Sequence, residues 1–138
     1  MNISLSTIIG RVLRYLWTAP CSIVGLCLAL PALFLGGGVR IVAGVVEVFV
    51  SRHKESNVFL KLLPFNAITF GHVVIAQTKL DLYRLRAHEH EHVRQYEKWG
   101  ILFFVAYIAA GLWALFQGHH PYWDNWFEVE ARANEIDK

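Results

Sequence analysis

No charged residue lies between Arg14 and Arg40, and this gap limits the possible folds more than any other feature of the sequence. Its central part, CSIVGLCLALPALFLGGGV, is long enough to cross roughly 30 Å of hydrocarbon as a helix. We interpret it as a membrane helix that is kinked at Pro31 and ended by the glycines at 36–38. The alternative is a hydrophobic hairpin that is buried against the rest of the protein.

The residues before this stretch have the pattern of an amphipathic helix. In STIIGRVLRYLW the apolar side chains lie largely opposite Arg11 and Arg14, which suits the membrane interface. We therefore expect residues 1–38 to form an amphipathic helix followed by a hydrophobic membrane helix. The composition agrees, because hydrophobic residues make up 55%, charged residues 17%, and the mean hydropathy is +0.37. The net charge of +2 gives no indication of a nucleic-acid partner.

The chain then changes to β-branched runs, which predict a small sheet. VRIV, VVEVFV and FNAITFGHVVIAQ are typical of two or three short strands, with a turn at Ala43-Gly44 and a polar loop near residues 51–57. We expect an antiparallel or mixed sheet. Within it, AITFGHVVI is expected to be an edge strand that can hold an extended peptide by strand addition, although ordinary sheet packing explains the pattern equally well.

Residues 78–100, TKLDLYRLRAHEHEHVRQYEKWG, are predicted to form a helix even though His and Glu alternate within them. A strand would place three histidines on one face, but the flanks are rich in residues that favour helices. Thr78 with Asp81 is a capping pair, and Gly100 stands where a helix would end. One stripe also recurs at steps of three and four residues: Leu82, Leu85, Glu89, His92, Tyr96 and Trp99.

On a helix, the run contains the spacing of a catalytic zinc site. His88 and His92 lie one turn apart and can bind one Zn²⁺, while Glu89 between them can take a proton from a zinc-bound water as general base. Chance produces this pentapeptide about 0.02 times in a chain of this composition. The alternative is a solvated, charge-rich helix face whose histidines bind nothing.

A third ligand is expected from the helix predicted in PYWDNWFEVEARANEID, with Asp124 or Asn125 as its cap. Its carboxylates are Glu128, Glu130 and Glu135. We expect the apolar segment 101–117 to run back alongside the helix of residues 78–100, packed or partly inserted rather than crossing a membrane. A returning helix then brings Glu128 to His88, whereas Glu130 faces away from Glu128 by about 200°.

Several further residues have candidate roles around such a site. Gln95 shares the face of the two histidines and can orient one of them. His120 and Tyr122 precede the last helix and are candidates for stabilising an oxyanion, although a solvated loop explains them as well. His72 is expected to be structural. Surplus histidines at 90, 119 and 120 leave open a metal-sensing protein that binds more than one ion.

These residues resemble the gluzincin metallopeptidases, most closely the membrane-bound group of the CAAX prenyl proteases and the bacterial heat-shock protease HtpX. The resemblance covers residues 65–132 and rests on four short motifs: NA at 66–67, GHVVI at 71–75, HEHEH at 88–92 and EVEA at 128–131. It implies Zn²⁺ on His88, His92 and Glu128, with Glu89 as base and peptide hydrolysis as the reaction. Arg132 departs from the pattern, because the family has an aspartate there that holds a ligand histidine.

The sequence thus predicts an α+β protein: a minimal zincin-like domain at 39–138 on an N-terminal membrane element at 1–38. The expected function is that of a zinc-dependent metalloendopeptidase acting on a peptide or protein. The expected partner besides the substrate is membrane lipid, and the expected location is the bacterial inner membrane. The alternatives are a noncatalytic membrane protein with a structural zinc site, a pseudo-peptidase, and, for location, a cytoplasmic protein with a buried hairpin.

Overall fold

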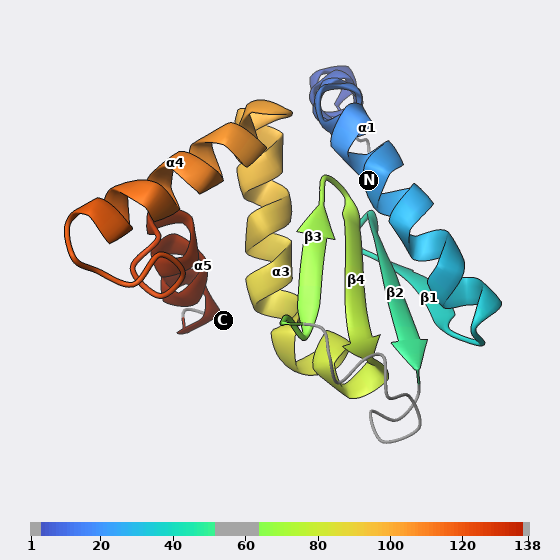
Figure 1. The fold of residues 1–138 in the computed structure, drawn as a ribbon. Helices are drawn as coiled ribbons and strands as arrows, with labels where there is room; N and C mark the ends of the chain where they lie inside the picture. The colour runs from blue at the N-terminus through green and yellow to red at the C-terminus, as the bar shows by residue number, and fades with distance from the viewer. Residues whose placement is uncertain (1–3, 52–63, 137–138) are drawn as a thin grey trace.

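A computed structural model describes residues 4–51 and 64–136, and the predicted loop near residues 51–57 lies almost wholly outside them. The described part contains four helices and a mixed four-stranded sheet, so the predicted α+β class is confirmed (Figure 1). The elements in chain order are α1 (Leu5–Phe34), β1 (Gly38–Val42), β2 (Val45–Ser51), β3 (Ala67–Phe70), β4 (Val73–Thr78), α3 (Lys79–Trp99), α4 (Leu102–Phe116) and α5 (Trp126–Ile136).

The strand order is β1-β2-β4-β3. β1 pairs with β2 and β3 pairs with β4 in antiparallel fashion, whereas β2 and β4 are parallel, with Val46 opposite Val73. The expected turn between the first two strands is present, because Ala43 and Gly44 both have positive φ angles, 50° and 81°. The sheet is therefore mixed, which is one of the two forms that the sequence predicted.

The expectation of one edge strand over AITFGHVVI is wrong. The stretch folds into a hairpin that turns at Gly71, whose φ of 58° suits a residue without a side chain. Only its first half, β3, is an edge strand, whereas β4 lies between β2 and β3 and is buried along its whole length. A continuous apolar run is typical of such an interior strand.

The sheet is covered on both faces (Figure 1). Val73 and Ile75 of β4 pack against Ala29 and Ala32 of α1. The alternate residues of β4 point to the other face and pack against Leu82 and Val93 of α3. The N-terminal helix therefore supplies part of the core of the sheet instead of standing apart from it.

α1 is one continuous helix, where the sequence suggested two. Its buried stripe consists of small side chains, which let the helix approach the sheet closely: Thr18, Cys21, Gly25, Ala29 and Ala32. The rest of its surface is apolar and largely exposed. α1 is the one described helix that is long and apolar enough to cross a membrane by itself, a property that it shares with core helices and signal sequences.

The helix α3 begins and ends where the sequence predicts. The Thr78 hydroxyl accepts a hydrogen bond from the Asp81 N–H at 3.0 Å, and Gly100 ends the helix with a φ of 56°. Asn125 caps α5 as expected, because its side-chain oxygen accepts the Phe127 N–H at 3.1 Å.

The expected path of residues 101–117 is wrong. α4 leaves α3 at a bend of 113° and so does not run back alongside it. The loop after Gly118 returns the chain, and α5 is the helix that packs along α3 (Figure 1). The glycine stop at the end of α3 allows this sharp change of direction, which the sequence pattern could not specify.

The packing of α1 on the sheet is tested by a matched pair of glycine substitutions. A Cβ at Gly25 would lie 2.8 Å from the Cβ atoms of both Phe70 and Val73, whereas a Cβ at Gly10 would meet nothing within 4 Å. We expect Gly25→Ala to destabilise the protein by about 1–3 kcal/mol. Gly10→Ala should stabilise α1 by about 0.5–1 kcal/mol. Thermal unfolding of both variants measures this, and equal effects would contradict the packing.

Candidate metal centre

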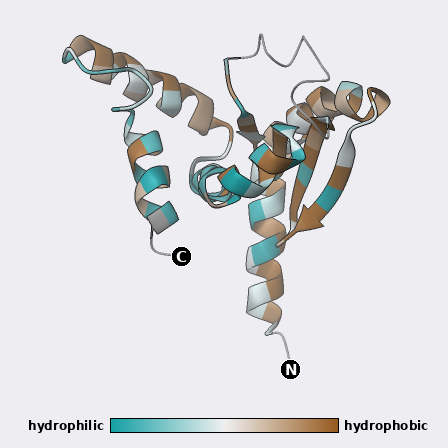
Figure 2. Ribbon diagram, turned by 90° about the horizontal axis from the view of Figure 1, so that it is seen from below, coloured by the Kyte–Doolittle hydropathy of each residue, from teal (hydrophilic) through white to brown (hydrophobic). Residues whose placement is uncertain are grey.

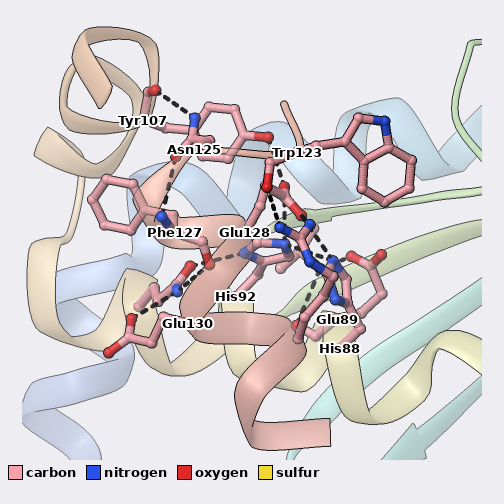
Figure 3. A network of polar contacts seen from close by, with 12 residues as sticks. His88, Glu89, His92, Tyr107, Trp123, Asn125, Phe127, Glu128 and Glu130 are labelled. Carbon is pink, nitrogen blue, oxygen red and sulfur yellow. Dashed lines mark hydrogen bonds and ion pairs between the residues drawn. The ribbon is translucent and has the colours of Figure 1, made fainter. Parts of the chain in front are cut away.

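Three side chains from α3 and α5 converge at the predicted site (Figure 3). His88 Nε2 lies 3.1 Å from His92 Nε2 and 3.2 Å from Glu128 Oε2. His92 Nε2 lies 3.4 Å from Glu128 Oε1. All three residues are buried. The helical spacing brings the two histidines together, and the packing of α5 on α3 adds the carboxylate.

These separations fit a metal ion. Tetrahedral ligands at 2.0–2.1 Å from a zinc ion stand about 3.3 Å apart, close to the three distances found here. Within the described residues, Glu128 Oε2 is buried and accepts no hydrogen bond of good geometry, and His88 Nε2, 3.2 Å away, can donate to it only when the imidazole is protonated. A buried carboxylate oxygen without a donor is costly unless a cation lies beside it. The cluster can therefore hold a metal ion, and its donor set is that of a two-histidine-plus-glutamate site.

Gln95 fixes the orientation of His92. Its amide nitrogen donates to the Phe127 carbonyl at 2.9 Å and to Glu130 at 2.8 Å, so its oxygen must be the atom 2.8 Å from His92 Nδ1. That oxygen can only accept, and Nδ1 therefore carries the hydrogen. The lone pair of His92 Nε2 is left pointing at Glu128, as metal binding requires.

His88 is held in the same way by a residue that the sequence analysis did not assign to this role. Its Nδ1 lies 2.6 Å from Oε1 of the Glu135 carboxylate, which accepts the Nδ1 hydrogen. The lone pair of His88 Nε2 is then available to a metal ion. Glu135 thus supplies the carboxylate that the family resemblance places at position 132. Arg132 instead donates to the Trp123 carbonyl and stands 4.0 Å from Glu128.

Glu89 lies beside the three ligands without belonging to them. It is buried, and the Thr69 hydroxyl of β3 donates a hydrogen bond of 2.6 Å to its Oε2. Burial raises the pKa of Glu89, a shift that the neighbouring His92 and the Thr69 hydrogen bond oppose. A buried carboxyl with a raised pKa, next to a metal site, is well placed to exchange protons.

The metal-free cluster binds protons where a metal would bind. Burial lowers the pKa of His88 and His92, but the hydrogen bond to Glu128 and the surrounding carboxylates outweigh it, so both pKa values are raised. Burial raises the pKa of Glu128, yet the hydrogen bonds to the two histidines outweigh it and lower the net pKa. Tyr107 also donates to Glu128 Oε1, at 2.6 Å.

A cavity of about 650 Å³ opens over the cluster. β3 forms one side of it, from Ala67 to Phe70, and aromatic side chains of α4 form another. Tyr122 lines the cavity, and partial burial together with Glu128 raises its pKa to about 12, so its hydroxyl stays protonated. His120 is not among the lining residues, and its Nδ1 accepts the backbone N–H groups of Tyr122 and Trp123 at 3.1 Å.

The remaining histidines of the motif region have other partners. His90 turns to the buried Glu47, with Nε2 2.9 Å from its carboxylate, which Arg40 and Arg86 also contact. His72 lies between Thr18, at 2.8 Å, and Glu97, at 2.9 Å. His72 therefore has the structural position that was expected of it.

The structure brings together most of the residues that the sequence nominated. His88, Glu89, His92 and Glu128 meet, Gln95 supports His92, and Glu130 contacts Gln95 and Lys98 instead of the ligands. Sequence reasoning missed three supporting residues: Thr69, Tyr107 and Glu135. Glu135 lies seven residues after Glu128 and so on the same face of α5, a spacing that could have revealed it. Thr69 and Tyr107 carry no such signal.

No protein-family model, no curated protein and no solved structure matches this chain.

The role of Glu135 is tested by metal affinity. Glu135→Ala removes the acceptor of the His88 Nδ1 hydrogen, and we expect the affinity for Zn²⁺ to fall at least about tenfold. The neighbouring Asn134→Ala is the control, because no ligand contact is lost there. Competition with a chelating dye measures both affinities. Equal affinities in the two variants would remove Glu135 from the site.

The charges of the cluster predict how stability depends on pH. The raised pKa values of His88 and His92 stabilise the metal-free protein fully below pH 6.5, and this stabilisation is lost as the pH rises through them. The lowered pKa of Glu128 also stabilises the metal-free protein at pH values above 4.5, and this stabilisation is lost as the pH falls through the lowered pKa. Metal-free protein should therefore unfold at a lower temperature at about pH 8 than at about pH 6, and Zn²⁺ should reverse the difference.

Thermal unfolding with a chelator or with Zn²⁺ measures this dependence. The Glu128→Gln variant is the control, because it removes the charge that raises the histidine pKa values. If chelated wild type is more stable at about pH 8 than at about pH 6, and Glu128→Gln shows the same slope, the electrostatic description of the cluster is wrong.

Proposed function

We propose that this protein is a zinc-dependent metalloendopeptidase with a zincin-like catalytic domain. The observation that carries the proposal is the pairing of a metal-ligand set with a separate buried carboxyl. His88, His92 and Glu128 have converging lone pairs, and Glu89 stands beside them with Thr69 as its one side-chain hydrogen-bond partner among the described residues. A purely structural site uses all of its positions for protein ligands, whereas a three-ligand set under a cavity leaves one position for substrate or water.

Zn²⁺ is the metal that we expect, because two imidazoles and one carboxylate form a borderline-soft donor set. When bound, it would supply a Lewis acid that acidifies water and polarises a carbonyl oxygen. His88, His92 and Glu128 would hold it. Glu135 contacts Nδ1 of His88, Gln95 contacts Nδ1 of His92, and Tyr107 donates to Oε1 of Glu128.

The chain's own residues then perform the proton transfers of hydrolysis. Glu89 removes a proton from the attacking water and gives it to the leaving nitrogen, so the peptide bond breaks into a carboxylate and an amine with one water consumed. Thr69 keeps the Glu89 carboxylate in place through its 2.6 Å hydrogen bond. Tyr122, protonated at neutral pH, can donate to the carbonyl oxygen of the substrate.

The proposed substrate is an extended peptide or protein segment. β3 is an edge strand of the described sheet, and its residues line the same cavity as the ligands. A peptide that adds to this edge would have its backbone fixed by strand hydrogen bonds. We further propose that the protein works at a membrane, on the basis of the long apolar α1.

The catalytic role of Glu89 is tested by an isosteric substitution. Glu89→Gln should bind Zn²⁺ as the wild type does and lose peptide hydrolysis by a factor of about 10²–10⁴. Glu91→Gln is the matched control: it is also buried on α3 but pairs with Arg94, away from the ligands. A fluorogenic peptide library measures turnover, and zinc content is measured on the same samples.

The outcomes separate the proposed enzyme from its alternative. If Glu89→Gln turns over peptides as fast as the Glu91→Gln control, the proton-transfer mechanism is wrong. If wild type binds one Zn²⁺ but cleaves nothing in the library, the site belongs to a noncatalytic protein or a pseudo-peptidase, and the metal has a structural role.

A further inference from the structure

Two helices present apolar surfaces that no described residue covers. On α1 the exposed side chains include Ile23, Leu26, Leu30 and Leu33, and on α4 they include Val105, Ile108, Leu112 and Phe116. There is no Asp, Glu, Lys or Arg between Arg14 and Arg40, nor between Lys98 and Asp124. Figure 2 shows that α4 is hydrophobic along nearly its whole length. Surfaces of this extent are typical of sites that bind a partner or a membrane.

These surfaces offer few side-chain hydrogen-bonding groups, so the partner that fits them is one that makes few hydrogen bonds. Between α1 and the strands β1 and β2 lies a groove of about 330 Å³, and every residue that lines it is apolar. Protein–protein interfaces usually carry about one hydrogen bond per 100–200 Å² and have a polar rim. Lipid acyl chains form no hydrogen bonds and need no polar rim, so a surface without charged residues suits them.

The tryptophans give a second, independent indication of lipid. All five are exposed to between 40 and 63% of their surface. Trp17 and Trp99 lie on α1 and α3 near the turn into α4, and Trp113 lies on α4 itself. Trp123 lies in the loop before α5, and Trp126 is the first residue of α5. Tryptophan is normally well buried, and it is enriched at the boundary between lipid headgroups and acyl chains.

The packing of α1 argues against a full crossing of the bilayer. Its charge-free half packs on the sheet through Ala29 and Ala32, and β1, the neighbouring edge strand, pairs only with β2 among the described strands. A sheet edge with unpaired backbone groups does not occur in the hydrocarbon of a membrane. The other half of α1 projects from the rest of the chain (Figure 2) but carries Arg11 and Arg14.

We infer that this protein is monotopic: the outer face of α1 and the exposed face of α4 lie in one leaflet of a lipid bilayer, and neither helix crosses it. Arg11 can extend its guanidinium to the headgroups, while Arg14 is held by Glu97 at 3.4 Å. Phe104 and Ile108 of α4 also line the cavity over the metal ligands, so the cavity opens beside the lipid. The inference does not depend on metal binding or catalysis.

Topology is tested on the full chain in bacterial spheroplasts and in inverted membrane vesicles. In a Cys27→Ser background, Ser4→Cys marks the start of α1 and Ala133→Cys marks the exposed surface of α5. Cys21 is buried, and the background protein measures its reactivity. A membrane-impermeant maleimide should label both marked positions in one preparation and neither in the other. Labelling of the two positions from opposite sides would show a crossing and overturn the inference.

The contact of α4 with lipid is tested with a matched pair of lysine substitutions. Leu112 on α4 and Leu80 on α3 are exposed to 60% and 53%, and Leu80 lies at the opposite end of α3 from α4. Leu112→Lys should weaken binding to vesicles of phosphatidylcholine and phosphatidylglycerol at least about tenfold, with Leu80→Lys close to wild type. Circular dichroism checks that both variants fold.

Two further results of the vesicle-binding experiment would contradict the inference in part or as a whole. Equal vesicle binding by the two lysine variants would remove α4 from the proposed surface. A wild-type chain that stays out of membranes as a dimer would assign the apolar faces to a second copy, and it would overturn the inference as a whole.

Discussion

The buried carboxylate of Glu128 is the group on which the site depends. It enters a largely apolar environment with α5, and it is tolerated because His88, His92 and Tyr107 converge on it. The two histidine contacts join α5 to α3, and the Tyr107 hydrogen bond joins α5 to α4. One electrostatic requirement therefore sets both the position of a helix and the shape of a metal-ligand set.

Support for the histidines comes from two different helices, and this makes the arrangement rigid. Gln95 holds His92 from α3 and continues to the Phe127 carbonyl of α5, while Glu135 holds His88 from α5. Each imidazole is thereby fixed in the tautomer that exposes Nε2. Arg132 does not support either histidine, and the carboxylate that contacts His88 comes from Glu135, three residues later.

Much of the site followed from the sequence, because local rules determine it. The caps at Thr78 and Gly100 and the spacing of His88 and His92 depend only on helix geometry, and both were predicted correctly. The 113° turn into α4 was not predicted, because it depends on how distant elements pack. The hairpin at Gly71 is local, but it was missed because the apolar pattern runs on through the turn. Thr69 could not be found because the packing of β3 against α3, which no local rule determines, brings it to Glu89.

The most direct test of the account is the number of metal ions per chain in purified protein. We predict about one Zn²⁺ in the wild type, a loss of tight binding in Glu128→Ala, and retention in Glu130→Ala, which lies two residues away but contacts Gln95 and Lys98. A folded wild-type protein that binds no stoichiometric metal would contradict the account. The run HEHEH would then be a charged helix segment held by ion pairs alone.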